Sequence, residues 1–134
     1  LYSMGNAVSN QRLGNLTSVT TAHTEDGVWI SVTFSKYSDG TVYLDRVEVV
    51  PTWVNLNTNN GSRQYNIVAL NDSTRDQWKE TYNMTENEFN AAQRSYDRTM
   101  ALVQDGLVKV QEYLDQQKQD REEFYLAQAQ NAAA

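Results

Sequence analysis

The chain has no cysteine and a single histidine among its 134 residues. The lack of cysteine excludes a disulfide framework and any metal site built from thiolates. Disulfides are the feature that separates an oxidising exterior from a reducing cytosol. Without them, both compartments stay open for this protein.

The sequence also lacks a long apolar run and an excess of basic residues. No run approaches the ~20 apolar residues that a membrane-spanning helix needs. Eleven Lys and Arg stand against seventeen Asp and Glu, which gives a formal net charge of −6. No stretch gathers basic residues into the stripe that a phosphate backbone requires. We therefore expect no nucleic-acid partner.

Proline and glycine are scarce, with one and six residues respectively, while 40% of the chain is hydrophobic. This composition is typical of a folded chain and not of a disordered or fibrous one. The length suits one domain of ordinary size with a modest core.

The clearest strand pattern lies at residues 28–35, where apolar residues alternate with Trp, Ser and Thr. A period of two indicates a half-buried strand. Asp39-Gly40 predicts a hairpin turn, with the β-branched residues 41–50 as the partner strand. Pro51 has no N–H and is expected to end regular pairing, so that 55–61 form an exposed loop before a third strand at 64–70.

Two helices are predicted after the strands. Ser73 with Asp76 resembles an N-cap, and Trp78 with Tyr82 one turn apart predicts a short amphipathic helix. Thr85 and Glu88 form the pattern of a capping box, which predicts a helix from residue 86 onward. The first helix is expected to be two or three turns long.

The second helix carries one apolar stripe with spacings of three and four residues, formed by Phe89, Ala92, Tyr96, Met100, Val103, Leu107, Val110 and Leu114. Such a stripe is typical of a helix docked on a core. Gly106 interrupts it at a cost of ~1 kcal/mol against alanine. We predict an α+β fold: an antiparallel sheet of at least three strands and a short helix in residues 1–84, then a long C-terminal helix and tail in 85–134.

The residues give little sign of catalysis. His23 has no second histidine or recognisable carboxylate spacing beside it, so we interpret it as an ordinary surface or loop residue and predict no metal ligands and no catalytic residues. Asp26-Gly27 and Asp39-Gly40 sit where turns favour aspartate for local hydrogen bonding, and we interpret both as turn residues. No glycine-rich phosphate loop or nucleophile elbow is present.

The first eleven residues offer a candidate binding segment. Gly5 lets the backbone come close to a neighbouring group, while Asn6, Ser9 and Asn10 project both donors and acceptors from the following loop. The alternative is that Gly5-Asn6 simply turns the chain, and the residues alone favour that interpretation.

Residues 2–11 resemble the Tyr-Ser-Leu-Gly-Asn-Phe segment of the bacterial capsule-synthesis, or poly-γ-glutamate biosynthesis, CapA family. Two further segments agree in order and spacing: Asp26-Gly27 leading into an alternating strand, and residues 50–54, Val-Pro-Thr-Trp-Val. The resemblance covers roughly residues 1–105. Ala7 departs from the aromatic residue common after Gly-Asn, and the Gln-rich helix extends past the family's usual end.

The resemblance implies a calcineurin-like metallophosphatase-related fold, with half of its sandwich formed here. This chain is then expected to be a C-terminal fragment that follows the segments resembling metal ligands. The fragment itself would need no cofactor, and any divalent metal would belong to the parent. Asn6 is the first candidate for a contact with substrate or with a metal ligand, and Gly5, Ser9 and Asn10 adjoin it.

The expected function is a part in capsule or poly-γ-glutamate exopolymer biosynthesis, inactive as this fragment. The implied partners are the missing N-terminal part of the same protein, a second copy of the chain and other exopolymer-synthesis proteins. The parent is expected to be extracytoplasmic and anchored to the membrane through its N-terminus. Two alternatives stay open: a non-catalytic interaction or assembly module, and half of a metal-dependent phosphoesterase.

Overall fold

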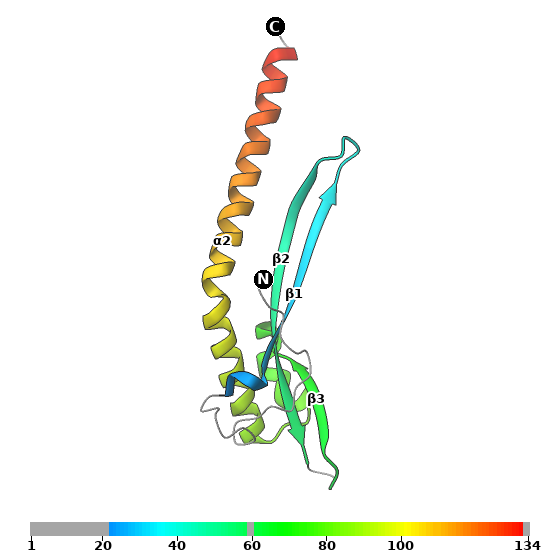
Figure 1. Cartoon of the computed structure of the whole chain (residues 1–134), viewed down its shortest axis with the longest axis vertical. Coiled ribbons are helices and arrows are strands. Elements are labelled where there is room, and N and C mark those ends of the chain that lie inside the picture. The colour runs from blue at the N-terminus through cyan, green and yellow to red at the C-terminus, as the bar shows by residue number, and fades with distance from the viewer. Residues whose placement is uncertain (1–21, 59–60, 133–134) are drawn as a thin grey trace. The chain divides into compact units, whose positions relative to one another are not determined.

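A computed structural model of the protein describes residues 22–58 and 61–132. Its elements follow in the order η1 (Ala22–Glu25), β1 (Asp26–Lys36), β2 (Val42–Asn57), β3 (Gln64–Ala69), η2 (Asp72–Gln77), α1 (Trp78–Thr81) and α2 (Glu86–Ala132) (Figure 1). The three strands form one sheet in the order β1-β2-β3, which confirms the predicted α+β class with an antiparallel sheet and a long C-terminal helix.

The described residues form two compact units. Unit 1 contains residues 22–30 and the described part of 49–102, and unit 2 contains residues 31–48 and 103–132. The strands β1 and β2 and the helix α2 each contribute residues to both units.

The hairpin turn in unit 2 forms where Asp39-Gly40 predicts it. Gly40 has a φ of 89°, the left-handed region that favours glycine. The Tyr37 N–H donates to the Thr41 carbonyl oxygen at 2.9 Å, and the Gly40 N–H donates to the Tyr37 carbonyl oxygen at 3.0 Å. These two hydrogen bonds close the connection between β1 and β2.

Strand β2 does not end at Pro51, so that prediction is wrong. The strand continues to Asn57 and pairs with β3 from Thr52↔Ala69 to Asn57↔Gln64. Proline lacks only the backbone N–H that would donate to the neighbouring strand. The Pro51 carbonyl oxygen still accepts a hydrogen bond from the Leu70 N–H at 2.8 Å. Asn55, expected in an exposed loop, is a buried strand residue.

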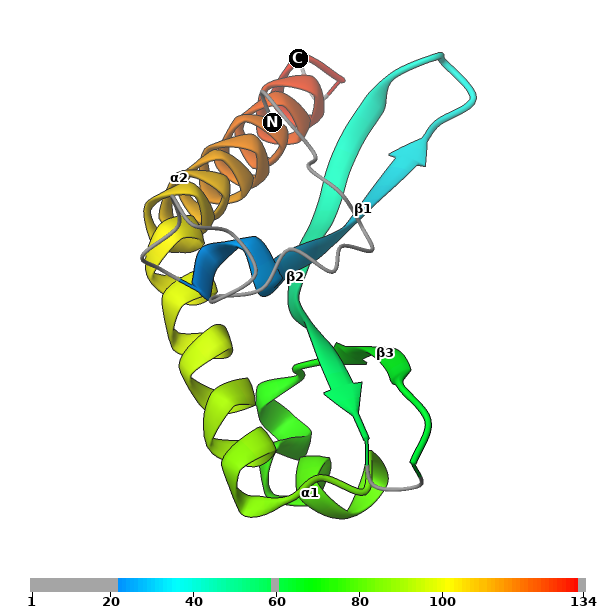
Figure 2. The same ribbon diagram turned by 60° about the horizontal axis from the view of Figure 1, so that its bottom comes forward.

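Unit 1 has its core between the β2–β3 pair and the helices that follow it. Six buried side chains form this core: Trp53, Val68, Leu70, Trp78, Met84 and Ala92. Figure 2 shows η2 and α1 beside the first turns of α2. The core therefore joins strand and helix residues that the sequence places up to 39 positions apart.

The short helix is less regular than predicted. It begins as the 3-10 segment η2 and has a single α-helical stretch of four residues, α1. Its cap is Asn71 and not Ser73, because the Asn71 Oδ1 accepts the Ser73 N–H at 3.1 Å. Trp78 is buried and donates from Nε1 to the Asn71 carbonyl oxygen at 3.0 Å.

Helix α2 begins as the capping box predicts. The Thr85 N–H donates to the Glu88 carboxylate at 2.7 Å, and the Glu88 N–H donates back to the Thr85 Oγ1 at 3.3 Å. The helix then runs without a break through Gly106 to Ala132. Every residue of the predicted stripe is buried or half-buried, whereas Leu102, Val108 and Tyr113 outside the stripe are exposed.

Within the described residues, no helix combines the length and the apolar character needed to cross a membrane.

Candidate functional site

The predicted binding residues Gly5, Asn6, Ser9 and Asn10 lie outside the described residues. The structure therefore leaves their predicted roles as predictions.

The strongest polar cluster in unit 1 surrounds the carboxylate of Asp26, whose side chain is only 9% exposed. Arg98 binds this carboxylate with two nitrogens, Nε to Oδ2 at 2.8 Å and Nη2 to Oδ1 at 2.6 Å. The fully buried Ser95 donates from Oγ to Oδ1 at 2.6 Å. We call Asp26, Ser95 and Arg98 the Asp26 cluster. A bidentate pair of this kind fixes both distance and orientation.

The cluster joins the first residue of β1 to α2. Arg98 lies three residues after Ser95, so the helix presents both side chains on one face. The hydrogen bond to Asp26 raises the pKa of the Arg98 guanidinium above its ordinary value, even though partial burial opposes this. Arg98 therefore stays charged throughout the physiological range, and the Asp26–Arg98 ion pair persists.

The Asp26 cluster favours a positioning role over catalysis. Both carboxylate oxygens of Asp26 already accept hydrogen bonds from α2. Ser95 is fully buried and gives its proton to a carboxylate, so it is not presented to a substrate. Catalytic nucleophiles and bases need access to the reacting atoms, which this arrangement does not provide.

Gly27 makes the close approach that lets β1 start beside β2. A Cβ at this position would lie 2.6 Å from Thr52 Oγ1, closer than side-chain carbons approach such atoms. On the neighbouring residue of β2, Trp53 Nε1 donates to the Glu25 carboxylate at 3.1 Å. The segments 25–27 and 52–53 are therefore in direct contact.

His23 lies in η1 with its side chain half exposed, and its Nδ1 is 3.8 Å from Asp26 Oδ2. This separation is too long for a hydrogen bond. Among residues 22–58 and 61–132, no three His, Cys, Asp or Glu side chains are grouped so as to hold a metal ion.

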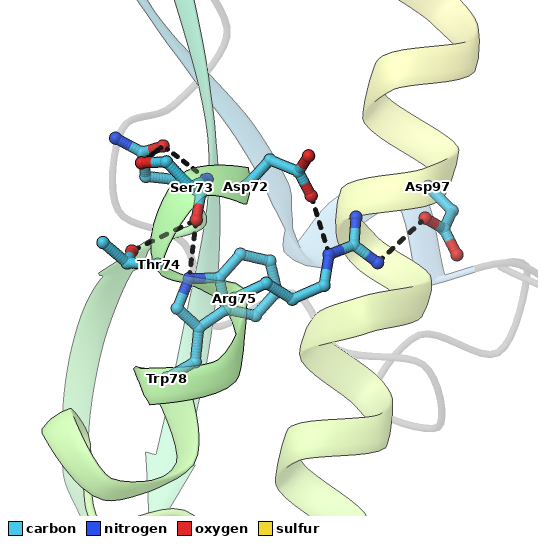
Figure 3. Close-up of polar contacts among 7 residues, drawn as sticks. Asp72, Ser73, Thr74, Arg75, Trp78 and Asp97 are labelled. Atoms are coloured by element: carbon cyan, nitrogen blue, oxygen red, sulfur yellow. Dashed lines mark hydrogen bonds and ion pairs between the residues drawn. The ribbon is translucent and has the colours of Figure 1, made fainter.

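Arg75 occupies a second polar cluster in unit 1, drawn in Figure 3. Its guanidinium lies 4.3 Å from the ring centre of Tyr96 and 5.4 Å from that of Trp78. It also contacts Asp72 at 2.8 Å and Asp97 at 3.8 Å. Cation–π and ionic contacts together hold η2 against α2, so this cluster stabilises the fold.

Unit 2 contains a shallow groove of about 620 Å³ between β2 and α2. Gln117 lines this groove, and its side-chain amide accepts the Leu44 N–H at 3.1 Å and donates to the Leu44 carbonyl oxygen at 2.8 Å. Arg121 also lines the groove, and its guanidinium lies 4.2 Å from the ring centre of Tyr43 and donates to the Tyr37 hydroxyl at 3.0 Å. That hydrogen bond raises the pKa of Arg121.

The interpretation of Asp26 as a turn residue is wrong, because its carboxylate binds a side chain 72 positions away. No local pattern marks that contact. Asp39 does make the predicted local bond, since its Oδ1 accepts the Thr41 N–H at 2.9 Å. Gln117 is likewise not predictable as a contact residue, because its position on the helix gives no sign that it reaches a strand.

Comparison of the chain with models of protein families, with curated proteins and with solved structures found no match.

Proposed function

We propose that this chain is the C-terminal, scaffolding part of a CapA-like protein that takes part in capsule or poly-γ-glutamate exopolymer biosynthesis. In this proposal the N-terminal part of the same protein holds any divalent metal. That part also anchors the protein at the outer face of the bacterial membrane. The chain supplies a rigid wall beside that site and is inactive alone.

One observation supports the proposal above others. Two of the three segments that resemble the family meet in unit 1, where Gly27 contacts Thr52. The Asp26 cluster then fixes this junction to α2 through three short hydrogen bonds. Segments that are typical of a family are expected to lie together where the backbone positions are tightly constrained. These two segments form one such junction.

A second candidate function is a non-catalytic interaction module. It is favoured by the large apolar side chains exposed in unit 2, among them Phe34 at 60% and Tyr113 and Phe124 each at 57%. Exposed aromatic side chains of this size can be buried against another molecule, which is the contact that an interaction module needs.

The proposed function is tested in a bacterium that carries the full-length gene and makes such a polymer. Deleting the gene should abolish surface polymer, and the wild-type gene should restore it. A Gly27→Val variant should fail to restore it, because the larger side chain collides with Thr52. A Gly106→Ala variant is the matched control, since its added Cβ meets only open space. Normal polymer in the deletion strain would overturn the proposal.

The full-length protein also separates the two candidates. Divalent-metal binding and phosphoesterase turnover by the purified parent would favour the CapA-like reading, and their loss in Asn6→Ala would place Asn6 in the site. A parent that binds no metal and turns over no phosphoester, yet retains a partner through unit 2, would favour the interaction module.

A further inference from the structure

Strand β1 has an open edge in unit 2. The sheet order β1-β2-β3 places β1 at the margin, so its residues 31–36 have β2 on one side and no described strand on the other. Two apolar side chains on this segment are exposed, Val32 at 45% and Phe34 at 60%. An unpaired strand carrying exposed apolar residues is a template for pairing with another strand.

The opposite edge of the same hairpin is already covered. In unit 2, β2 lies between β1 and α2 (Figure 1). Gln117 satisfies both the N–H and the carbonyl oxygen of Leu44, as a neighbouring strand would do. Helix α2 thus protects one edge of the hairpin, and the edge of β1 is the one that no strand among residues 22–58 and 61–132 pairs with.

The direction of the backbone groups on that edge follows from the turn. The Tyr37 N–H donates across the hairpin to Thr41. Alternate residues of an antiparallel strand turn to the same neighbour, so Ser31, Thr33 and Ser35 face β2 with their backbone groups. The N–H and carbonyl groups of Val32 and Phe34 then point to the open edge.

We infer that this edge binds the same strand of a second copy of the chain, antiparallel and centred on Thr33. The segment Ser31-Val32-Thr33-Phe34-Ser35 reads almost the same in both directions. Centring on Thr33 places each Val32 opposite the other copy's Phe34. These are the residues with outward backbone groups, so two pairs of hydrogen bonds form while the apolar side chains meet.

Charge also favours a second copy as the occupant. The chain carries a net charge of −6, yet residues 28–35 contain no charged side chain. Two copies can therefore meet along this segment without like-charge repulsion, although the rest of their surfaces repel. Natural edge strands that avoid pairing place a lysine or another charge within the strand, and here the first lysine, Lys36, lies beyond the paired segment.

Cysteine cross-linking tests the pairing and its register in the complete chain. The protein has no cysteine of its own, so one introduced residue reports one contact. Opposed residues that are not hydrogen-bonded to each other have Cα atoms about 4.5 Å apart, within the range of a disulfide. Thr33→Cys should give a covalent dimer under mild oxidation, and Ser38→Cys in the exposed turn is the matched control that should stay monomeric.

The proposed register also predicts which pairs of residues in the two copies lie opposite each other. Ser31→Cys and Ser35→Cys should each stay monomeric alone but should cross-link when mixed, because Ser31 lies opposite Ser35 of the other copy. If Thr33→Cys cross-links no faster than Ser38→Cys, the inference is overturned. Binding of a different protein segment to this edge would give that same result.

Oxidation can also trap two chains that meet only briefly. Association is therefore measured without cross-linking as well. Sedimentation equilibrium from about 1 µM to about 1 mM should show reversible dimers of the wild-type chain. Thr33→Lys should weaken association at least tenfold, because two ammonium groups then meet at the symmetry axis. Mixing Thr33→Lys with Thr33→Glu should restore a one-to-one dimer. A wild-type chain that is monomeric over this whole range would overturn the inference.

Discussion

Among single residues, the glycines differ in what surrounds them. A Cβ at Gly27 would meet Thr52 Oγ1 at 2.6 Å, whereas a Cβ at Gly106 would meet nothing within 4 Å. Gly27 is therefore required by contact. Gly106 occupies an open helix position where alanine is preferred by about 1 kcal/mol.

The two glycines give opposite predictions. Gly27→Ala should lower the free energy of unfolding by about 1–3 kcal/mol, the usual cost of overpacking. Gly106→Ala should raise it by about 0.5–1 kcal/mol. Urea unfolding followed by circular dichroism measures both. Adding Thr52→Ala, which removes the colliding oxygen, should recover part of the loss from Gly27→Ala, and purely additive effects would contradict the contact.

Asp39 gives a prediction for pH. The Thr41 N–H donates to its carboxylate and lowers the pKa of Asp39 below its ordinary value of 3.8. Because the pKa is lower in the folded state, the bond stabilises the hairpin above about pH 3.8 and is lost as the pH falls through the folded value. An NMR titration of the Asp39 carboxyl group should show a midpoint below 3.8, and a midpoint at or above 3.8 would contradict the bond.

These residues also show which contacts a sequence can reveal. The Asp39 bond spans two residues, so the turn pattern Asp-Gly was enough to predict it. The Asp26 carboxylate meets Arg98 only after the chain has formed two more strands and two helical segments. Its partner depends on tertiary structure, and no local pattern carries that information.

Among the elements, α2 follows its sequence most closely. The capping box of Thr85 and Glu88 and the apolar stripe act within a few residues, and both are confirmed. Strand β2 departs from its sequence because Pro51 was expected to stop it. Strand pairing continues because the Pro51 carbonyl oxygen still accepts a hydrogen bond from the Leu70 N–H. Pro51 lacks only the hydrogen bond that a backbone N–H would donate.

Gln117 links α2 to the hairpin in unit 2 through both polar groups of its side-chain amide. Gln117→Ala removes both bonds to Leu44 and should lower the stability of unit 2 by about 1–3 kcal/mol. Amide hydrogen exchange is the direct readout, and the Leu44 N–H should lose protection. Gln116→Ala is the matched control, because its amide bonds only to Asp120 on the same helix. Equal protection of Leu44 in both variants would contradict this role.

For the whole molecule, the strands β1 and β2 and the helix α2 each contribute residues to both compact units. Unit 1 contains the junction of residues 25–27 with residues 52–53, held by the Asp26 cluster. Unit 2 offers the open edge of β1. The proposed scaffold role depends on the first, and the proposed self-association depends on the second, so the two fail or hold separately.

The most direct test of the account is a double-mutant cycle on Asp26→Ala and Arg98→Ala, measured by urea unfolding. Removing either partner leaves a largely buried charge unpaired and should cost about 3 kcal/mol. The double variant should cost little more than either single one, which gives a coupling energy of about 2 kcal/mol or more. Single effects that add to within about 0.5 kcal/mol would contradict the claim that this pair fixes the junction to α2.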